Sequence, residues 1–132
     1  MREIEFRGKR LKDNKWIHGF YHNETSIVSP ATNRKRTAHH IYRQDIDALV
    51  KPETVGQYTG VKDKNGRKIF EGDIVTYNIQ NDKHRSEVYY YDGGFCIKNS
   101  TIEGLCLVQH YQDMEVEVIG NIHDNPQLLE EY

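Results

Sequence analysis

The stretch that decides the fold is VGQYTGVKDKNGRKIFEGDIVTY, residues 55–77. Its aromatic and β-branched segments are short and are separated by Gly, Asn and Asp, a pattern typical of strands joined by tight turns. The pair Asn65-Gly66 predicts a hairpin turn in which both residues have positive φ. Gly72 and Asp73 predict a second turn, directly before a strand of alternating polarity.

Further short strands are predicted on the C-terminal side of this stretch, at residues 87–91, 95–98, 104–108 and 115–119. Five or six short strands with tight turns are typical of a small barrel, which closes on itself and leaves no exposed sheet edge. We therefore expect a mostly β protein with an SH3-like β-barrel over about residues 55–123.

The N-terminal part of the chain predicts a β-hairpin. A strand over residues 3–7 carries Ile4 and Phe6 on one face, and a turn over 12–15 leads to a second strand over 16–21. The hairpin is expected to form from the pairing of these two strands.

The residues that follow this hairpin predict an irregular subdomain. Residues 22–36 are mostly polar and predict a loop around a brief strand at 27–28, before another strand over 37–43. A helical turn or two is expected only near residues 44–50 or in the tail after Pro126.

The charge is unevenly distributed along the 132 residues, although the formal net charge is only −2. Residues 1–43 carry ten Lys or Arg against four Asp or Glu, whereas residues 44–132 carry eight against sixteen. This split fits a basic surface for phosphate, or two complementary surfaces that meet within or between chains. We divide the chain into a β-rich basic segment, residues 1–50, and the barrel with its short tail, residues 51–132.

Four blocks of the sequence carry a resemblance to a known family. They are residues 4–10 with 14–19, residues 52–66, residues 69–75 and residues 118–126. In this order they resemble the YopX family of small phage and prophage proteins. The resemblance implies a β-rich fold with an SH3-type barrel at its centre, and it implies no activity and no functional residues.

The two cysteines, Cys96 and Cys106, are predicted to be small core residues on strands. Both lie five residues from Thr101, so they are expected to face each other across a hairpin whose midpoint is Thr101. They belong to no CxxC pair and do not predict a zinc site. In a reducing compartment they should remain free thiols.

The sequence predicts neither an enzyme nor a cofactor. The pair His39-His40 points to opposite faces of a strand and cannot chelate one ion, and the other histidines are scattered, at positions 18, 22, 84, 110 and 123. Glu71 and Asp73 flank a turn glycine and are interpreted as capping residues. No nucleophile elbow, phosphate-binding glycine loop or HExxH zinc motif occurs.

The basic residues are the only candidate binding residues. They are Arg34, Lys35 and Arg36 in the predicted loop, with a further group near the first turn that comprises Arg7, Lys9, Arg10 and Lys12. The aromatic run 89–91 could stack on bases, but the acidic residues around it would repel phosphate. We therefore assign these tyrosines to the core and to ordinary surface without a binding role.

Two functional hypotheses follow. The first is a non-enzymatic protein-interaction module of a phage or prophage, which contacts a protein partner or a second copy of itself. The alternative is a nucleic-acid-binding accessory protein that uses the basic N-terminal segment. Because no apolar run reaches the length of a membrane span, we expect no membrane partner and a location in the host cytoplasm.

Overall fold

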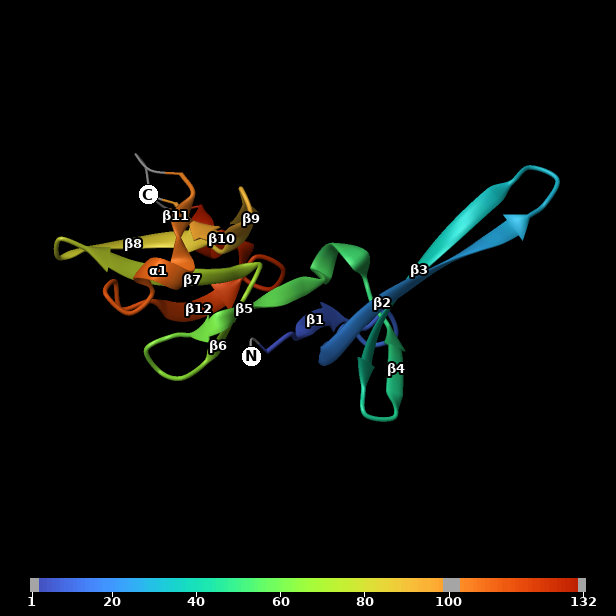
Figure 1. Ribbon diagram of the computed structural model, residues 1–132, viewed down its shortest axis with the longest axis horizontal. Helices are drawn as coiled ribbons and strands as arrows, with labels where there is room; N and C mark the ends of the chain where they lie inside the picture. The colour runs from blue at the N-terminus through green and yellow to red at the C-terminus, as the bar shows by residue number, and fades with distance from the viewer. Residues whose placement is uncertain (1–2, 99–102, 131–132) are drawn as a thin grey trace. The chain divides into compact units, whose positions relative to one another are not determined.

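The computed structural model describes residues 3–98 and 103–130 of the chain (Figure 1). These residues form two compact units, an N-terminal unit, Ile4–Gln57, and a C-terminal unit that begins at Tyr58. Both units are built almost entirely from antiparallel strands, so the prediction of a mostly β protein is confirmed.

The N-terminal unit pairs its strands in the order β4-β3-β2-β1-β5. The elements are β1 (Phe6–Lys9), β2 (Trp16–Ser29), β3 (Arg34–Arg43), β4 (Ile46–Leu49), the 3-10 turn η1 (Pro52–Thr54) and the first residues of β5 (Gly56–Lys62). Its core consists of Ile17, Ile41 and Val50, with Phe6, Tyr21, Ala48 and Val55 against them.

The predicted N-terminal hairpin is confirmed in its pairing. β1 and β2 are antiparallel, with Phe6 opposite Gly19 and Lys9 opposite Trp16. The first strand begins at Phe6 and not at Glu3. The prediction that Ile4 and Phe6 share one face of this strand is therefore wrong. Ile4 is exposed, because it precedes the strand and has no core to cover.

The loop expected over residues 22–36 is wrong, because most of it belongs to one long hairpin of β2 and β3 (Figure 1). The pairing runs from Phe20 opposite Tyr42 to Ser29 opposite Arg34. Both faces of the outer hairpin are exposed, so its sequence has no apolar alternation to reveal the strands.

The helical turn expected near residues 44–50 is also wrong, since this segment forms β4. β4 pairs with β3, and Ala48 lies opposite Ile41 against the core. Four residues are too few for periodicity to distinguish a strand from a helical turn.

The C-terminal unit contains two three-stranded sheets, β12-β7-β8 and β11-β10-β9, and the pair of β5 with β6. The further elements are β6 (Lys68–Phe70), β7 (Asp73–Ile79), β8 (Asp82–Glu87), β9 (Tyr89–Tyr91), β10 (Gly94–Ile97), β11 (Leu105–Cys106), α1 (Leu107–His110), β12 (Glu117–Asn121) and the 3-10 turn η2 (Pro126–Leu129). The described strands form no closed barrel, so the SH3-like barrel is not confirmed.

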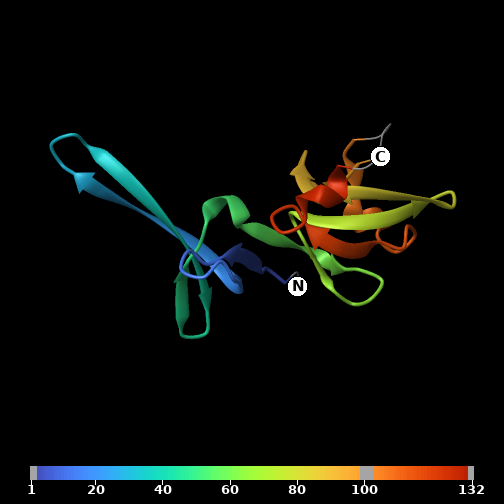
Figure 2. The same cartoon turned by 180° about the vertical axis from the view of Figure 1, so that it is seen from behind.

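One hydrophobic core holds the C-terminal unit together. It is formed by Ile69, Val75, Tyr77, Val88, Phe95, Ile97, Leu107, Met114, Val116 and Val118. Burial raises the pKa of Tyr77 to about 12, and its hydroxyl donates a hydrogen bond to the carbonyl oxygen of Lys98. The helical turn expected after Pro126 is confirmed as η2, which lies beside β8 in the view from behind (Figure 2).

The turn at Asn65-Gly66 differs in type from the one predicted. Gly66 has a φ of +83°, whereas Asn65 does not have positive φ, so the expectation for Asn65 is wrong. The amide of Gly66 donates to the carbonyl oxygen of Asp63 at 3.0 Å, and the amide of Asp63 donates to the carbonyl oxygen of Arg67 at 2.8 Å. The loop is therefore one residue longer than a two-residue hairpin, with glycine at the left-handed position. Gly72 has a φ of +92°, as its predicted turn role requires.

The two cysteines confirm the predicted hairpin register. Cys96 lies opposite Cys106 in the pairing of β10 with β11, and both are free thiols. Burial raises the pKa of the Cys96 thiol. Thr101, the expected midpoint, lies outside the described residues. The strand expected over 104–108 is shorter, because α1 begins at Leu107.

Candidate binding pocket

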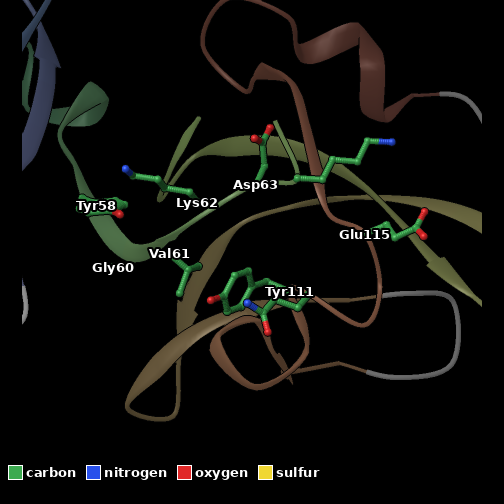
Figure 3. Close-up of a pocket in the computed structure, with 9 residues that line it drawn as sticks. Tyr58, Gly60, Val61, Lys62, Asp63, Tyr111 and Glu115 are labelled. Carbon is green, nitrogen blue, oxygen red and sulfur yellow. The ribbon is translucent and has the colours of Figure 1, made fainter. Parts of the chain in front are cut away.

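The C-terminal unit contains a pocket of about 560 Å³ beside the bend of β5 (Figure 3). One wall is the segment from Tyr58 to Lys64, and the other is the segment between α1 and β12. The lining residues are Tyr58, Gly60, Val61, Lys62, Asp63, Lys64, Tyr111, Gln112 and Glu115.

An irregularity in β5 shapes the first wall. Tyr58 lies opposite Phe70 and Lys62 opposite Lys68, so β5 has two residues more than β6 between these pairs. Gly60 absorbs the bend with a φ of +94°, a conformation that disfavours other residues. The bend presents Val61 and Lys62 at the pocket (Figure 3).

A single helical turn shapes the second wall. The amide of Tyr111 donates to Leu107 at 2.9 Å, and the amide of Met114 donates to His110 at 3.1 Å. Glu115 then has a φ of +50°, which ends the turn and leads the chain into β12. The half-buried Tyr111 ring faces the pocket from this turn (Figure 3).

The buried carboxylate of Asp63 holds the two walls in place. Its Oδ1 accepts hydrogen bonds from the amides of Asn65 and Arg67, both at 2.9 Å, and its Oδ2 accepts one from the amide of Val118 at 3.0 Å. These bonds fix the turn after β5 and attach it to β12. Asp63 is therefore a structural residue of the pocket.

The charged side chains at the rim give the pocket a mixed character. Lys62 is exposed, and the Lys64 ammonium lies 3.7 Å from the Glu117 carboxylate. On the opposite side, the Asn78 amide donates to the Glu115 carboxylate at 3.4 Å. A ligand that carries an apolar group beside an acidic group would complement this pocket, because the pocket has an aromatic wall beside an exposed lysine.

The candidate basic residues lie elsewhere, at the start of β3. Arg34, Lys35 and Arg36 are all exposed, and Lys35 points to the opposite face of the hairpin from its two neighbours because residues alternate along a strand. The structure therefore does not gather them on one face.

Three basic residues near the first turn are occupied by contacts within the N-terminal unit. The Arg7 guanidinium lies 4.6 Å from the centre of the Trp16 ring, and the Lys9 ammonium lies 5.4 Å from it. Arg10 forms an ion pair with Asp13. The Asp13 carboxylate offsets the charge of Arg10, and the Trp16 ring holds the cations of Arg7 and Lys9 within the unit.

The capping role predicted for Asp73 is supported, because its Oδ2 accepts a hydrogen bond from the amide of Phe70 at 2.8 Å. The opposite orientation predicted for the pair His39-His40 is also supported. His39 bonds the Tyr21 hydroxyl at 2.7 Å, whereas His40 bonds Asp47 at 3.0 Å. Sequence reasoning did not identify the pocket, because Tyr111 lies far along the chain from β5 and nothing in its local sequence marks it.

Comparisons with known proteins identify a family and a solved structure of similar fold. The family model described as "YopX protein" matches residues 5–130. Among solved structures, the chain is similar to the crystal structure of protein EF1440 from Enterococcus faecalis, with 25% sequence identity, 98% of this chain and 99% of that chain covered, and a TM-score of 0.54. A search of the curated proteins found no match.

Proposed function

This chain belongs to the YopX protein family, and from that premise we propose that it is a non-enzymatic protein-interaction module encoded by a phage or prophage. The same proposal includes a location in the host cytoplasm and an SH3-like organisation of the C-terminal unit. No helix among the described residues is long and apolar enough to cross a membrane.

The pocket between β5 and the α1–β12 segment is the observation that carries this proposal. Its described lining residues include two tyrosines, a valine and an exposed lysine, and include no Ser, Cys or His that could act as a nucleophile. Such a lining suits a short extended peptide. The peptide would place an apolar side chain against Val61 and Tyr111 and an acidic residue near Lys62.

Removal of the Tyr111 ring should weaken peptide binding by about tenfold or more, because a half-buried aromatic wall supplies much of the contact area. The probe is a set of random-sequence peptides selected on phage against the full chain. Affinities of the selected peptides are measured for wild type and for Tyr111→Ala by calorimetry, and amide shifts in NMR spectra locate the site.

The matched control is Tyr90→Ala, since Tyr90 is exposed in the same unit and does not line the pocket. This variant should bind the selected peptides as wild type does. The proposal is overturned if the peptides bind Tyr111→Ala with unchanged affinity, or if the amide shifts lie away from the pocket.

The alternative function predicts strong, salt-dependent oligonucleotide binding, and we expect none near physiological salt. Phosphate binding releases counterions, so an affinity carried by three cations should fall steeply with salt. Gel-shift titrations with single-stranded and duplex oligonucleotides provide the measurement. A sub-micromolar complex would favour the alternative if it is lost when Arg34, Lys35 and Arg36 are all replaced by Ala. The same replacement should reduce the salt slope by up to about three units.

A further inference from the structure

Two histidines and one aspartate meet on one face of the sheet formed by β2, β3 and β4. His22 lies directly opposite His40 in the pairing of β2 with β3. Asp47 lies opposite Tyr42 in the pairing of β3 with β4. Because Tyr42 and His40 are two residues apart, they share a face of β3, and the side chains of all three residues gather there.

The distances between the polar atoms suit a shared ion. His40 Nδ1 lies 3.0 Å and His22 Nε2 lies 3.5 Å from the same oxygen, Oδ1 of Asp47. The ligand atoms that the three residues can offer all lie within 4.8 Å of one another. A tetrahedral zinc ion with bonds of about 2.1 Å places its ligands about 3.4 Å apart. The two nitrogen–oxygen distances, 3.0 and 3.5 Å, lie on either side of that spacing.

Two imidazole nitrogens in this cluster form no hydrogen bond with the described residues. They are the Nε2 atoms of His22 and His40, and both are buried from solvent. Buried polar atoms without partners are rare and destabilising, and each requires an explanation. An ion held by His22 Nε2, His40 Nδ1 and Asp47 Oδ1 would give His22 Nε2 a ligand bond in addition to its 3.5 Å contact with Asp47.

One of the two imidazole rings must rotate out of the stack before both can bind one ion. His22 and His40 are stacked, with ring centres 4.6 Å apart and planes 9° from parallel, so their lone pairs point along parallel planes. Rotation about the terminal torsion of one imidazole directs its nitrogen toward the other two ligands, and that torsion is soft. The His22 side chain is 36% exposed and has room for this movement.

We propose that His22, His40 and Asp47 bind a divalent transition-metal ion, with Zn²⁺ as the best match. Two imidazoles and one carboxylate favour zinc, copper or nickel over magnesium and calcium, which prefer oxygen ligands. Three protein ligands leave one position for water. The site lies in the N-terminal unit and does not depend on the proposed peptide pocket.

Calorimetric titration of the full chain with ZnCl₂, in a buffer that does not chelate metals, should show one ion per chain. His22→Asn and Asp47→Asn should each weaken the affinity for Zn²⁺ by about tenfold or more. In known metal sites, even the mutation of a residue that only supports a ligand lowers the affinity by that much. MgCl₂ should give no comparable binding.

Two control variants match these substitutions. Asp45→Asn removes an exposed carboxylate two residues from Asp47, and His110→Gln removes a histidine outside the cluster. Both should leave the Zn²⁺ affinity unchanged. Far-UV circular dichroism confirms that each variant is folded, and the two ligand substitutions provide independent tests.

Co²⁺ provides a spectroscopic readout of the same site. Bound Co²⁺ should show visible absorption bands of a low-coordinate imidazole site, and these bands should disappear in His22→Asn. The proposal is overturned if Zn²⁺ does not bind at about 100 µM, a free energy of roughly 5.5 kcal/mol. It is equally overturned if His22→Asn and Asp47→Asn bind Zn²⁺ as wild type does.

Discussion

Asp63→Asn should lower the free energy of unfolding by about 3 kcal/mol or more, one of the two largest effects that we expect for a single substitution. The wild-type carboxylate accepts three backbone hydrogen bonds through two oxygens and is almost completely buried. The amide has only one oxygen, so its NH₂ group must face at least one amide donor. A buried donor then loses its partner, which costs more than the bond itself is worth.

Chemical denaturation followed by circular dichroism measures this effect. The matched control is Asp82→Asn, because Asp82 is an exposed acid at the start of β8 in the same unit. It should change the free energy of unfolding by no more than about 0.5 kcal/mol. An unchanged denaturation midpoint for Asp63→Asn would mean that Asp63 does not hold β5 and β12 together.

Gly19→Ala should destabilise the N-terminal unit by roughly 3 kcal/mol or more, at the upper end of overpacking effects. A Cβ atom at Gly19 would lie 1.9 Å from the carbonyl oxygen and 2.8 Å from the carbonyl carbon of Tyr42. Both are backbone atoms of β3, so no side chain can move aside to relieve the clash. The close crossing of β2 and β3 would have to open.

The fluorescence of Trp16, the single tryptophan of the chain, reports on this unit during denaturation. The control is Gly94→Ala, because a Cβ at Gly94 meets no atom within 4 Å and its φ is not positive. Its midpoint should remain close to that of wild type. A wild-type midpoint for Gly19→Ala would contradict the close approach of the two strands.

Local patterns in the sequence were sufficient where the nearest residues decide the structure. The Asn65-Gly66 pair identified a turn, because a left-handed position selects glycine, although the type of turn was wrong. The equal spacing of Cys96 and Cys106 from Thr101 identified their register, because antiparallel strands pair residues at equal distances from a turn.

The same local patterns failed where no buried face imposed a pattern. The outer part of β2 and β3 is exposed on both sides, so its sequence is that of a polar loop even though its backbone forms a regular ladder. The short β4 is held by its pairing with β3 and was not identifiable alone. Barrel closure depends on which strand edges meet, a property that the separate strands do not encode.

The sequence by itself determined the β class, the positions of most turns, the cysteine register and the family, since each depends on residues close together in the chain or on matching blocks. Only the tertiary structure decided the candidate sites. Tyr111 meets the bend of β5 because α1 turns it back toward that strand, and His22 meets His40 and Asp47 through the pairing of three strands. Both arrangements depend on pairing and packing between distant segments, and no local pattern specifies those.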